Sequence, residues 1–247
     1  GAVLFVGIKE KPESAGFDPV EDTEVAATGE NEKKESIRTI LFENVLKNPF
    51  IWGMALTYFF VYVIRQGVTS WFVFYLLQEK GAVDAGAAAA RVSGLELGGL
   101  FGSLLAGRLS DMAIANSEGS GVVGKRVQVV IAYTVGIAAS LIAFRGCPAS
   151  WPAAQWACIF TIGFFLYGPQ MLIGLCGAEL VGPASVGASE GFLGWVAYLG
   201  AANAGVPLSI IVRDYGWNTY FATLLAACAA VIVLMAPMVR LKSFVQR

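Results

Sequence analysis

The stretch PFIWGMALTYFFVYVIRQGVTSWFVFYLL, residues 49–77, is long enough to cross a lipid bilayer as one helix and carries a single charged residue, Arg65, in its interior. An Arg side chain keeps its proton, and holding it at membrane depth costs about 2.5 to 3.5 kcal/mol on insertion scales. A polar cavity, a carboxylate partner or an anionic substrate can offset that cost. Arg65 is therefore the first candidate for a functional residue, and a structural ion pair inside a helix bundle is the alternative.

Composition predicts an integral membrane protein. Hydrophobic residues make up 56% of the 247 positions and charged residues 14%, whereas soluble domains carry about 25% charge. A hydrocarbon core of about 30 Å needs about 20 apolar residues in helical form. Six windows of this kind predict an all-α fold, with spans at approximately Pro49–Leu77, Arg91–Leu109, Val127–Phe144, Trp151–Leu180, Ser185–Val212 and Gly216–Val239.

We expect three parts along the chain. Residues 1–8 are apolar, lack an initiator Met and are too short to span, so we interpret them as the end of a truncated upstream transmembrane helix. Residues 9–47 hold ten of the eighteen acidic residues and six of the seventeen basic ones, which predicts a hydrated linker. Its last part, Ser36–Lys47, regains apolar positions at helical spacing and should form a short amphipathic helix on the membrane surface. Residues 48–247 contain the six spans.

Basic residues are distributed unevenly between the two ends of the predicted spans. Twelve Lys and Arg fall on the side that holds the linker and the C-terminus, and four fall on the opposite side. The positive-inside rule therefore predicts that the linker and the C-terminus face the cytoplasm. This distribution fits the plasma membrane, a plastid envelope and the endoplasmic reticulum equally well.

Residue usage excludes several chemistries within this chain. There is no His, which excludes His-based metal sites and Ser-His-Asp hydrolysis. The four Cys residues have no C-x-x-C spacing, so no disulfide framework is implied. We expect no enzyme, no metal site, no cofactor and no nucleic-acid partner.

The second predicted span carries a packing signal and a charge. Gly94, Gly98 and Gly102 form consecutive G-x-x-x-G units, a spacing that lets a neighbouring helix approach closely. Glu96 would face away from that contact and could line a cavity, either as the counter-charge of Arg65 or beside a substrate. Glu190 is the third charge at membrane depth, although its place near a helix start offers dipole stabilisation as an alternative reason.

Two tyrosines share a helical stripe with Arg65. Tyr58, Tyr62 and Arg65 occur at i, i+4 and i+7, so their side chains should lie on one face of the first span. A guanidinium presents a planar fork of donors that matches two oxygens of a phosphate, and tyrosine hydroxyls add neutral hydrogen bonds. The stripe thus predicts an oxyanion site. Without the arginine, the tyrosines would be interpreted as packing residues.

Four motifs along the chain have a distinctive pattern: FVYVIRQG at 60–67, GRLSD at 107–111 with GKR at 124–126, GFFLYGPQMLIG at 163–174, and GASEGFLG at 187–194. They resemble the C-terminal half of the organophosphate:phosphate antiporters, a family of the major facilitator superfamily that includes glycerol-3-phosphate, hexose-phosphate and glucose-6-phosphate exchangers. The resemblance covers essentially the whole chain, and its most specific part is YGPQMLIG. The linker segment KPESAG, residues 11–16, is also similar to the family's linker.

The resemblance implies an exchanger built from two six-helix halves, with the substrate between them at mid-membrane. The family's phosphate site takes one Arg from each half, and Arg65 matches the Arg of this half. The other implied substrate-binding residues are Tyr62, Tyr167, Tyr198, Glu96 and Glu190. The superfamily's cytoplasmic motif, which latches helices in one conformational state, would comprise Gly107, Arg108, Asp111, Lys125 and Arg126.

The resemblance leaves the organophosphate open. Glu190 is similar to the acidic position of the hexose-phosphate branch, yet residues 203–212 lack the Lys that this branch carries there. The implied partners are an organophosphate, inorganic phosphate, the N-terminal half and the lipid bilayer. Competing interpretations are a transporter-like sensor of sugar phosphates and a facilitator for another small anion or sugar.

Overall fold

The computed structural model describes residue 16, residues 40–116 and residues 121–246. Residues 1–8 and most of the predicted linker lie outside the described part. The described helices belong to one compact unit, Ile37–Arg247. They are η3 (Ile40–Leu46), α3 (Pro49–Glu79), α4 (Ala85–Val92), α5 (Gly94–Ala115), α6 (Val122–Gly146), α7 (Pro152–Glu179), η4 (Pro183–Ser185), α8 (Val186–Asn203), α9 (Val206–Met235), η5 (Ala236–Met238) and η6 (Phe244–Gln246).

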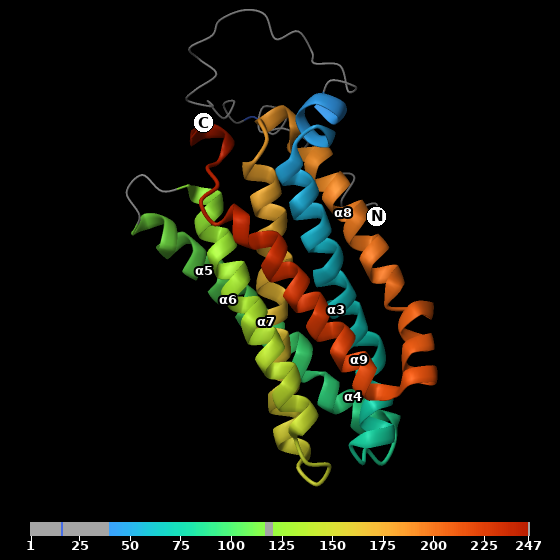
Figure 1. The fold of residues 1–247 in the computed structure, drawn as a ribbon. Coiled ribbons are helices and arrows are strands. Elements are labelled where there is room, and N and C mark those ends of the chain that lie inside the picture. The colour runs from blue at the N-terminus through green and yellow to red at the C-terminus, as the bar shows by residue number, and fades with distance from the viewer. Residues whose placement is uncertain (1–15, 17–39, 117–120, 247) are drawn as a thin grey trace, which may run out of the picture. The chain divides into compact units, whose positions relative to one another are not determined.

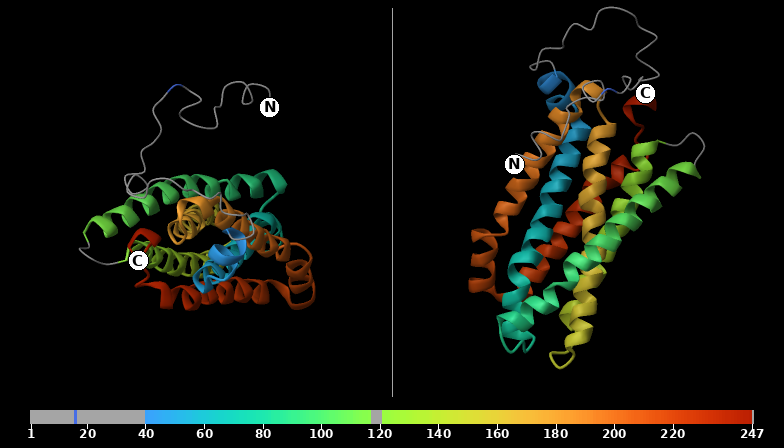
Figure 2. Two further views of the ribbon diagram at one scale, coloured as in Figure 1. Left: turned by 90° about the horizontal axis from the view of Figure 1, so that it is seen from above. Right: turned by 180° about the vertical axis from the view of Figure 1, so that it is seen from behind.

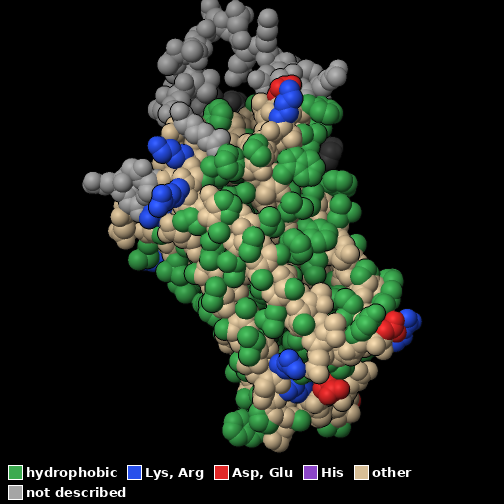
Figure 3. Space-filling model, in the orientation of Figure 1, with side chains coloured by type: hydrophobic (Ala, Val, Ile, Leu, Met, Phe, Trp, Pro, Cys, Tyr) green, Lys and Arg blue, Asp and Glu red, His purple; other side chains and the backbone are tan. Residues whose placement is uncertain are grey.

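Six of these helices are long, and they correspond to the six predicted spans. By length and composition, four stretches can cross a membrane, and the last of them, Pro183–Met238, includes both α8 and α9. α5 is not among the four, and it carries Glu96, Arg108 and Asp111 in 22 residues. Figure 3 shows apolar side chains over most of one face, with Lys and Arg near its two ends. The predicted all-α membrane fold is confirmed.

α3 and α7 are the central helices of the bundle. α7 packs against α5, α6, α3 and α8, and α3 packs against α8, α9 and α7. Seen along the helices in Figure 2, α5 and α9 lie on opposite sides of this group. Side chains that α3 and α7 share with their neighbours therefore lie in the middle of the bundle.

Local sequence explains where the central helices begin. Asn48 precedes α3, and its Oδ1 accepts a hydrogen bond from the backbone N–H of Phe50 at 3.0 Å. Pro49 and Pro152 occupy the first turns of α3 and α7, where a proline costs no helical hydrogen bond. Within α7, Pro169 has no N–H to donate to the carbonyl four residues earlier, which weakens the helix at that point.

Two of the predicted spans have different boundaries in the structure. The span Arg91–Leu109 is divided, because Arg91 belongs to the short helix α4 and α5 begins at Gly94. The span Ser185–Val212 was also wrong: α8 ends at Asn203, and α9 starts at Val206 after a turn. The apolar sequence continues across this turn, so hydropathy alone does not detect it. Gly216, the predicted start of the sixth span, has φ 75° and ψ 178° and interrupts α9.

The end of the predicted linker and the C-terminus lie at the same end of the bundle, as the sequence analysis expected. Figure 1 shows η3, the C-terminus, the end of α5 and the start of α6 at one end, and the α3–α4 and α6–α7 turns at the other. η3 is the described part of the predicted amphipathic helix, and it packs against α8 and α3 with Val45 buried. The cytoplasmic assignment of the first end stays a prediction.

Candidate functional site

Arg65 lies among aromatic side chains from α3 and α7. Its guanidinium carbon is 5.4 Å from the ring centroid of Tyr167 and 5.9 Å from that of Tyr62, both within cation–π distance. Its Nε atom is buried and has no hydrogen-bond partner in the described part of the chain. Arg65 thus combines an uncompensated charge with an unused donor.

Arg65 and Glu96 do not form the ion pair that the sequence left open. The four ion pairs among the described residues involve other arginines and a lysine. Instead, the Tyr167 hydroxyl donates a hydrogen bond to Glu96 Oε2 at 2.6 Å, and the ring of Tyr167 faces Arg65. Glu96 is exposed, as expected for a residue that faces away from the glycine contact. Tyr167 therefore contacts both Arg65 and Glu96, and the two charged side chains do not form an ion pair with each other.

A chain of aromatic rings extends this arrangement across α3 and α8. The Tyr62 ring lies 5.0 Å from the ring of Tyr58 and 5.6 Å from the ring of Tyr198, measured between centroids. Tyr198 is 69% exposed, so most of its ring is free of contacts within this chain. The structure thus brings five predicted site residues together: Arg65, Tyr62, Tyr167, Tyr198 and Glu96.

Glu190 lines a cavity together with Tyr167, a member of this group. The cavity has a volume of about 600 Å³ and is lined in part by Tyr58, Tyr167, Gln170, Ser103 and Glu190. Glu190 packs on two glycines of α7: a Cβ placed at Gly174 would come within 3.1 Å of Glu190 Oε2, and one at Gly177 within 3.2 Å of Oε1. The Oε1 atom is buried and has no hydrogen-bond partner among the described residues.

The sequence analysis quoted Gln170 within a motif but assigned it no role. Its Nε2 donates to the Tyr62 hydroxyl at 3.4 Å, and its Oε1 is buried without a donor in the described part. A polar side chain directly after a Gly-Pro pair would have been the signal. Ser103 was also missed, although it lies seven residues after Glu96 and therefore on the same face of α5, which the sequence analysis expected to line a cavity.

The predicted latch residues lie near helix ends. Gly107, Arg108 and Asp111 belong to α5, and Lys125 and Arg126 belong to α6. The spans that were predicted to end at Leu109 and to start at Val127 are longer in the structure, because α5 continues to Ala115 and α6 begins at Val122.

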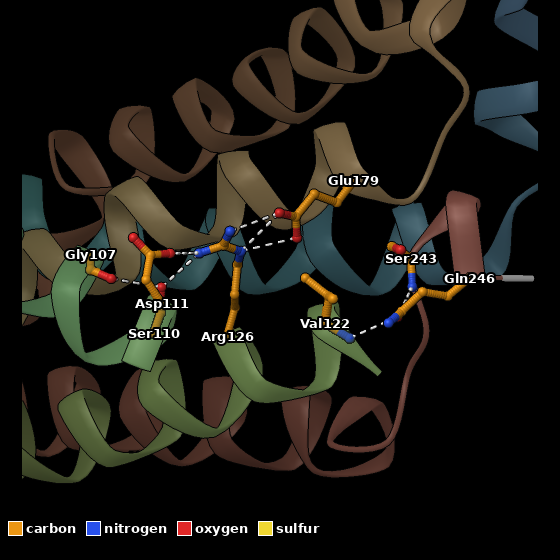
Figure 4. Close-up of polar contacts among 8 residues, drawn as sticks. All are labelled: Gly107, Ser110, Asp111, Val122, Arg126, Glu179, Ser243 and Gln246. Carbon is orange, nitrogen blue, oxygen red and sulfur yellow. Dashed lines mark hydrogen bonds and ion pairs between the residues drawn. The ribbon is translucent and has the colours of Figure 1, made fainter. Parts of the chain in front are cut away.

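Arg126 forms the centre of this cluster (Figure 4). Its Nε donates to both carboxylate oxygens of Glu179 at 3.0 Å, and its Nη1 donates to Ser110 Oγ at 2.7 Å and Asp111 Oδ1 at 3.1 Å. The Arg126 side chain is 10% exposed. One guanidinium thereby joins the ends of α5, α6 and α7.

Two predicted latch residues do not join the cluster, and two residues outside the predicted latch, Ser110 and Glu179, do. Arg108 and Lys125 have no hydrogen bond or ion pair in the described ranges, and Arg108 borders an open groove along α5. Glu179 was missed, although a carboxylate inside the predicted span 151–180 was a visible signal. The C-terminal segment lies beside the cluster: the backbone N–H of Val122 donates to Gln246 Oε1 at 2.9 Å.

Comparison with known proteins identifies the family. The family model of the Major Facilitator Superfamily matches residues 1–205. The chain belongs to the major facilitator superfamily. Members of this superfamily are transporters, which indicates transport rather than catalysis.

The chain is similar to organophosphate carriers and to a sensor. It is 37% identical to a probable hexose phosphate transport protein of Chlamydia muridarum, over 95% of this chain and 52% of that protein. It is 35% identical to the membrane sensor protein UhpC of Salmonella typhimurium, over 96% and 52%. It is 33% identical to the hexose-6-phosphate:phosphate antiporter of the same bacterium, over 95% and 51%.

These relatives confirm the resemblance to the organophosphate:phosphate antiporter family. The chain spans about half the length of the curated relatives it matches.

Proposed function

We propose that this chain supplies one half of an exchanger that carries an organophosphate, a sugar phosphate or glycerol 3-phosphate, against inorganic phosphate. The other half would be an N-terminal set of six helices, and the substrate would bind between the halves. Arg65 would bind the phosphate, with Tyr62, Tyr167 and Tyr198 around it. Glu96 and Glu190 would border the same site.

The state of Arg65 is the observation that carries this proposal. A guanidinium inside a bundle of apolar helices is costly unless something compensates it. The described residues provide two aromatic faces and no carboxylate within ion-pair distance. A phosphate would supply the missing charge and accept from the unused Nε donor.

Exchange in proteoliposomes tests the proposal. The carrier that joins this chain to its N-terminal half is reconstituted with phosphate inside the vesicles, and uptake of labelled phosphate, glucose 6-phosphate or glycerol 3-phosphate is followed. We expect saturable uptake that requires internal phosphate. Uptake of another solute with no competition by phosphate would favour a facilitator and contradict the proposal.

The similarity to a membrane sensor protein supports a second candidate. A sensor would bind a sugar phosphate at the same residues and signal through a partner protein. Flux separates the two: a sensor binds glucose 6-phosphate in an equilibrium assay and gives no counterflow in vesicles.

The Arg126 cluster would act as a latch at the cytoplasmic ends of the helices. By the positive-inside rule, that end holds the linker and the C-terminus. Because one buried guanidinium joins three helices, opening this end of the bundle would require its hydrogen bonds to break.

A further inference from the structure

Two residues that line the cavity, Gln170 on α7 and Glu190 on α8, each have a buried acceptor atom without a partner. These atoms are Gln170 Oε1 and Glu190 Oε1, and neither has a hydrogen-bond partner in the described residues. A buried polar atom without a partner is costly, so native structures nearly always satisfy such atoms. Both atoms need hydrogen-bond donors.

The phosphate group of a phosphorylated sugar is mostly a dianion at pH 7, because its second pKa is about 6, so its oxygens act as acceptors and cannot satisfy these atoms. Neutral hydroxyl groups can, since each provides one O–H donor. The amide nitrogen of Gln170, Nε2, already donates a hydrogen bond to the Tyr62 hydroxyl. The amide oxygen, Oε1, is the atom of this side chain that still lacks a partner. Arg65 does not line the cavity itself, but its guanidinium lies against the ring of Tyr167, which does. The region that can bind hydroxyl groups therefore adjoins the proposed phosphate site.

The spacing along α7 fits one ligand that reaches both regions. Tyr167 faces Arg65, Gln170 follows three residues later, and Gly174, which contacts Glu190, follows after four more. With a rise of 1.5 Å per residue, Tyr167 and Gly174 are about 10 Å apart along the helix. This is the reach of a phosphorylated sugar.

We propose that Gln170 is a specificity-determining residue that accepts a hydrogen bond from a hydroxyl of the organophosphate, with Glu190 as a second acceptor in the same cavity. This inference rests on the proposed function and goes beyond it, because it assigns separate residues to the phosphate and to the polyol. Inorganic phosphate would occupy only the Arg65 end and would not use Gln170.

The test compares two exchange reactions in the variant Gln170→Leu of the carrier that contains this chain. Leu has similar size but no acceptor. Because Leu also removes the donor to Tyr62, we expect a modest rise in the KM for phosphate self-exchange. The KM for glucose 6-phosphate exchange should rise about tenfold more than that, as expected when one polar contact to a substrate is removed. The matched control is Gln66→Leu, because Gln66 donates to Ser70 and does not line the cavity; both reactions should be unchanged.

Deoxy analogues of glucose 6-phosphate provide a readout that a structural role would not move. In the wild type, removing the hydroxyl that contacts Gln170 should weaken competition with phosphate, and in Gln170→Leu the same analogue should compete as well as glucose 6-phosphate does. Equal losses for phosphate and glucose 6-phosphate, or unchanged KM values for both, would overturn the inference. A carrier with no phosphate exchange in the wild type would instead contradict the proposed function itself.

Discussion

At the scale of single residues, Arg65 is the side chain whose surroundings decide most about function. The rings of Tyr62 and Tyr167 lie against its guanidinium, and the hydroxyl of Tyr167 reaches Glu96. An aromatic face stabilises a cation by electrostatics but offers it no hydrogen-bond acceptor. The planar donor fork of Arg65 is therefore available to an oxyanion.

We predict that Arg65→Lys weakens substrate binding by about 1.5 to 3 kcal/mol, the range for a hydrogen bond to a charged group. Lys keeps the charge and loses the bidentate geometry. Equilibrium binding of labelled phosphate to the full carrier measures the effect. The exposed Arg213 serves as the control, since Arg213→Lys should leave binding unchanged. Unchanged phosphate affinity in Arg65→Lys would show that only the charge matters.

At the scale of elements, α5 and α7 approach so closely that their contact depends on glycine. A Cβ at Gly98 would overlap the carbonyl of Phe160, one at Gly102 would overlap the carbonyl of Phe164, and one at Gly163 would overlap that of Leu95. The predicted G-x-x-x-G contact of α5 is confirmed. This contact also places Glu96 beside Tyr167, because it fixes how far α5 is shifted along its axis relative to α7.

Overpacking usually costs about 1 to 3 kcal/mol. We expect Gly98→Leu to destabilise the carrier by more than this, because the backbone atoms that it meets cannot move aside as side chains do. Thermal unfolding in detergent, followed by the loss of the monodisperse species, measures the change. Gly146→Ala is the control, since a Cβ there meets nothing within 4 Å. Similar melting temperatures for Gly98→Leu and the control would show that the helices can separate freely.

The Arg126 cluster is the second contact that joins elements. Glu179→Gln removes the charge that accepts two of the four hydrogen bonds of Arg126. We predict a loss of stability of about 1.5 to 3 kcal/mol, together with a shift of the exchange rate that Asp214→Asn does not produce. Asp214 pairs with Arg213 on the exposed surface. An unaltered exchange rate in Glu179→Gln would remove the cluster from the transport cycle.

At the scale of the whole molecule, the described helices leave large apolar and aromatic side chains exposed on α5 and α8. Leu100, Phe101 and Leu104 on α5 are 56%, 55% and 67% exposed, and Tyr198 on α8 is 69% exposed. Exposed leucines on a membrane helix can also face lipid. The exposure of a site residue such as Tyr198, however, fits a site that a second half completes.

We predict that reconstituted chain 1–247 shows no phosphate exchange, because a half-site cannot alternate access around a substrate held between two halves. Co-production with the N-terminal half should restore exchange in the same vesicle assay. Exchange by the monomeric chain alone would contradict the two-half proposal, and exchange by a dimer would show that two copies can replace the full carrier.

The sequence by itself determined the fold class, the approximate spans and most of the candidate site. This is possible because a lipid environment forces each apolar segment to satisfy its backbone hydrogen bonds internally, so a helix can be predicted from its own residues. The charge of Arg65 and the tyrosine stripe around it were likewise visible within one segment.

Only the tertiary structure decided how these residues combine. The hydrogen bond between Tyr167 and Glu96 joins residues 71 positions apart, and that between Arg126 and Glu179 joins residues 53 apart. Such contacts depend on how each helix is rotated and how deeply it packs, which its own sequence does not specify. For the same reason the sequence could not show that Tyr167 contacts both Arg65 and Glu96, or that Gln170, which lines the cavity, has a buried acceptor without a partner in the described residues.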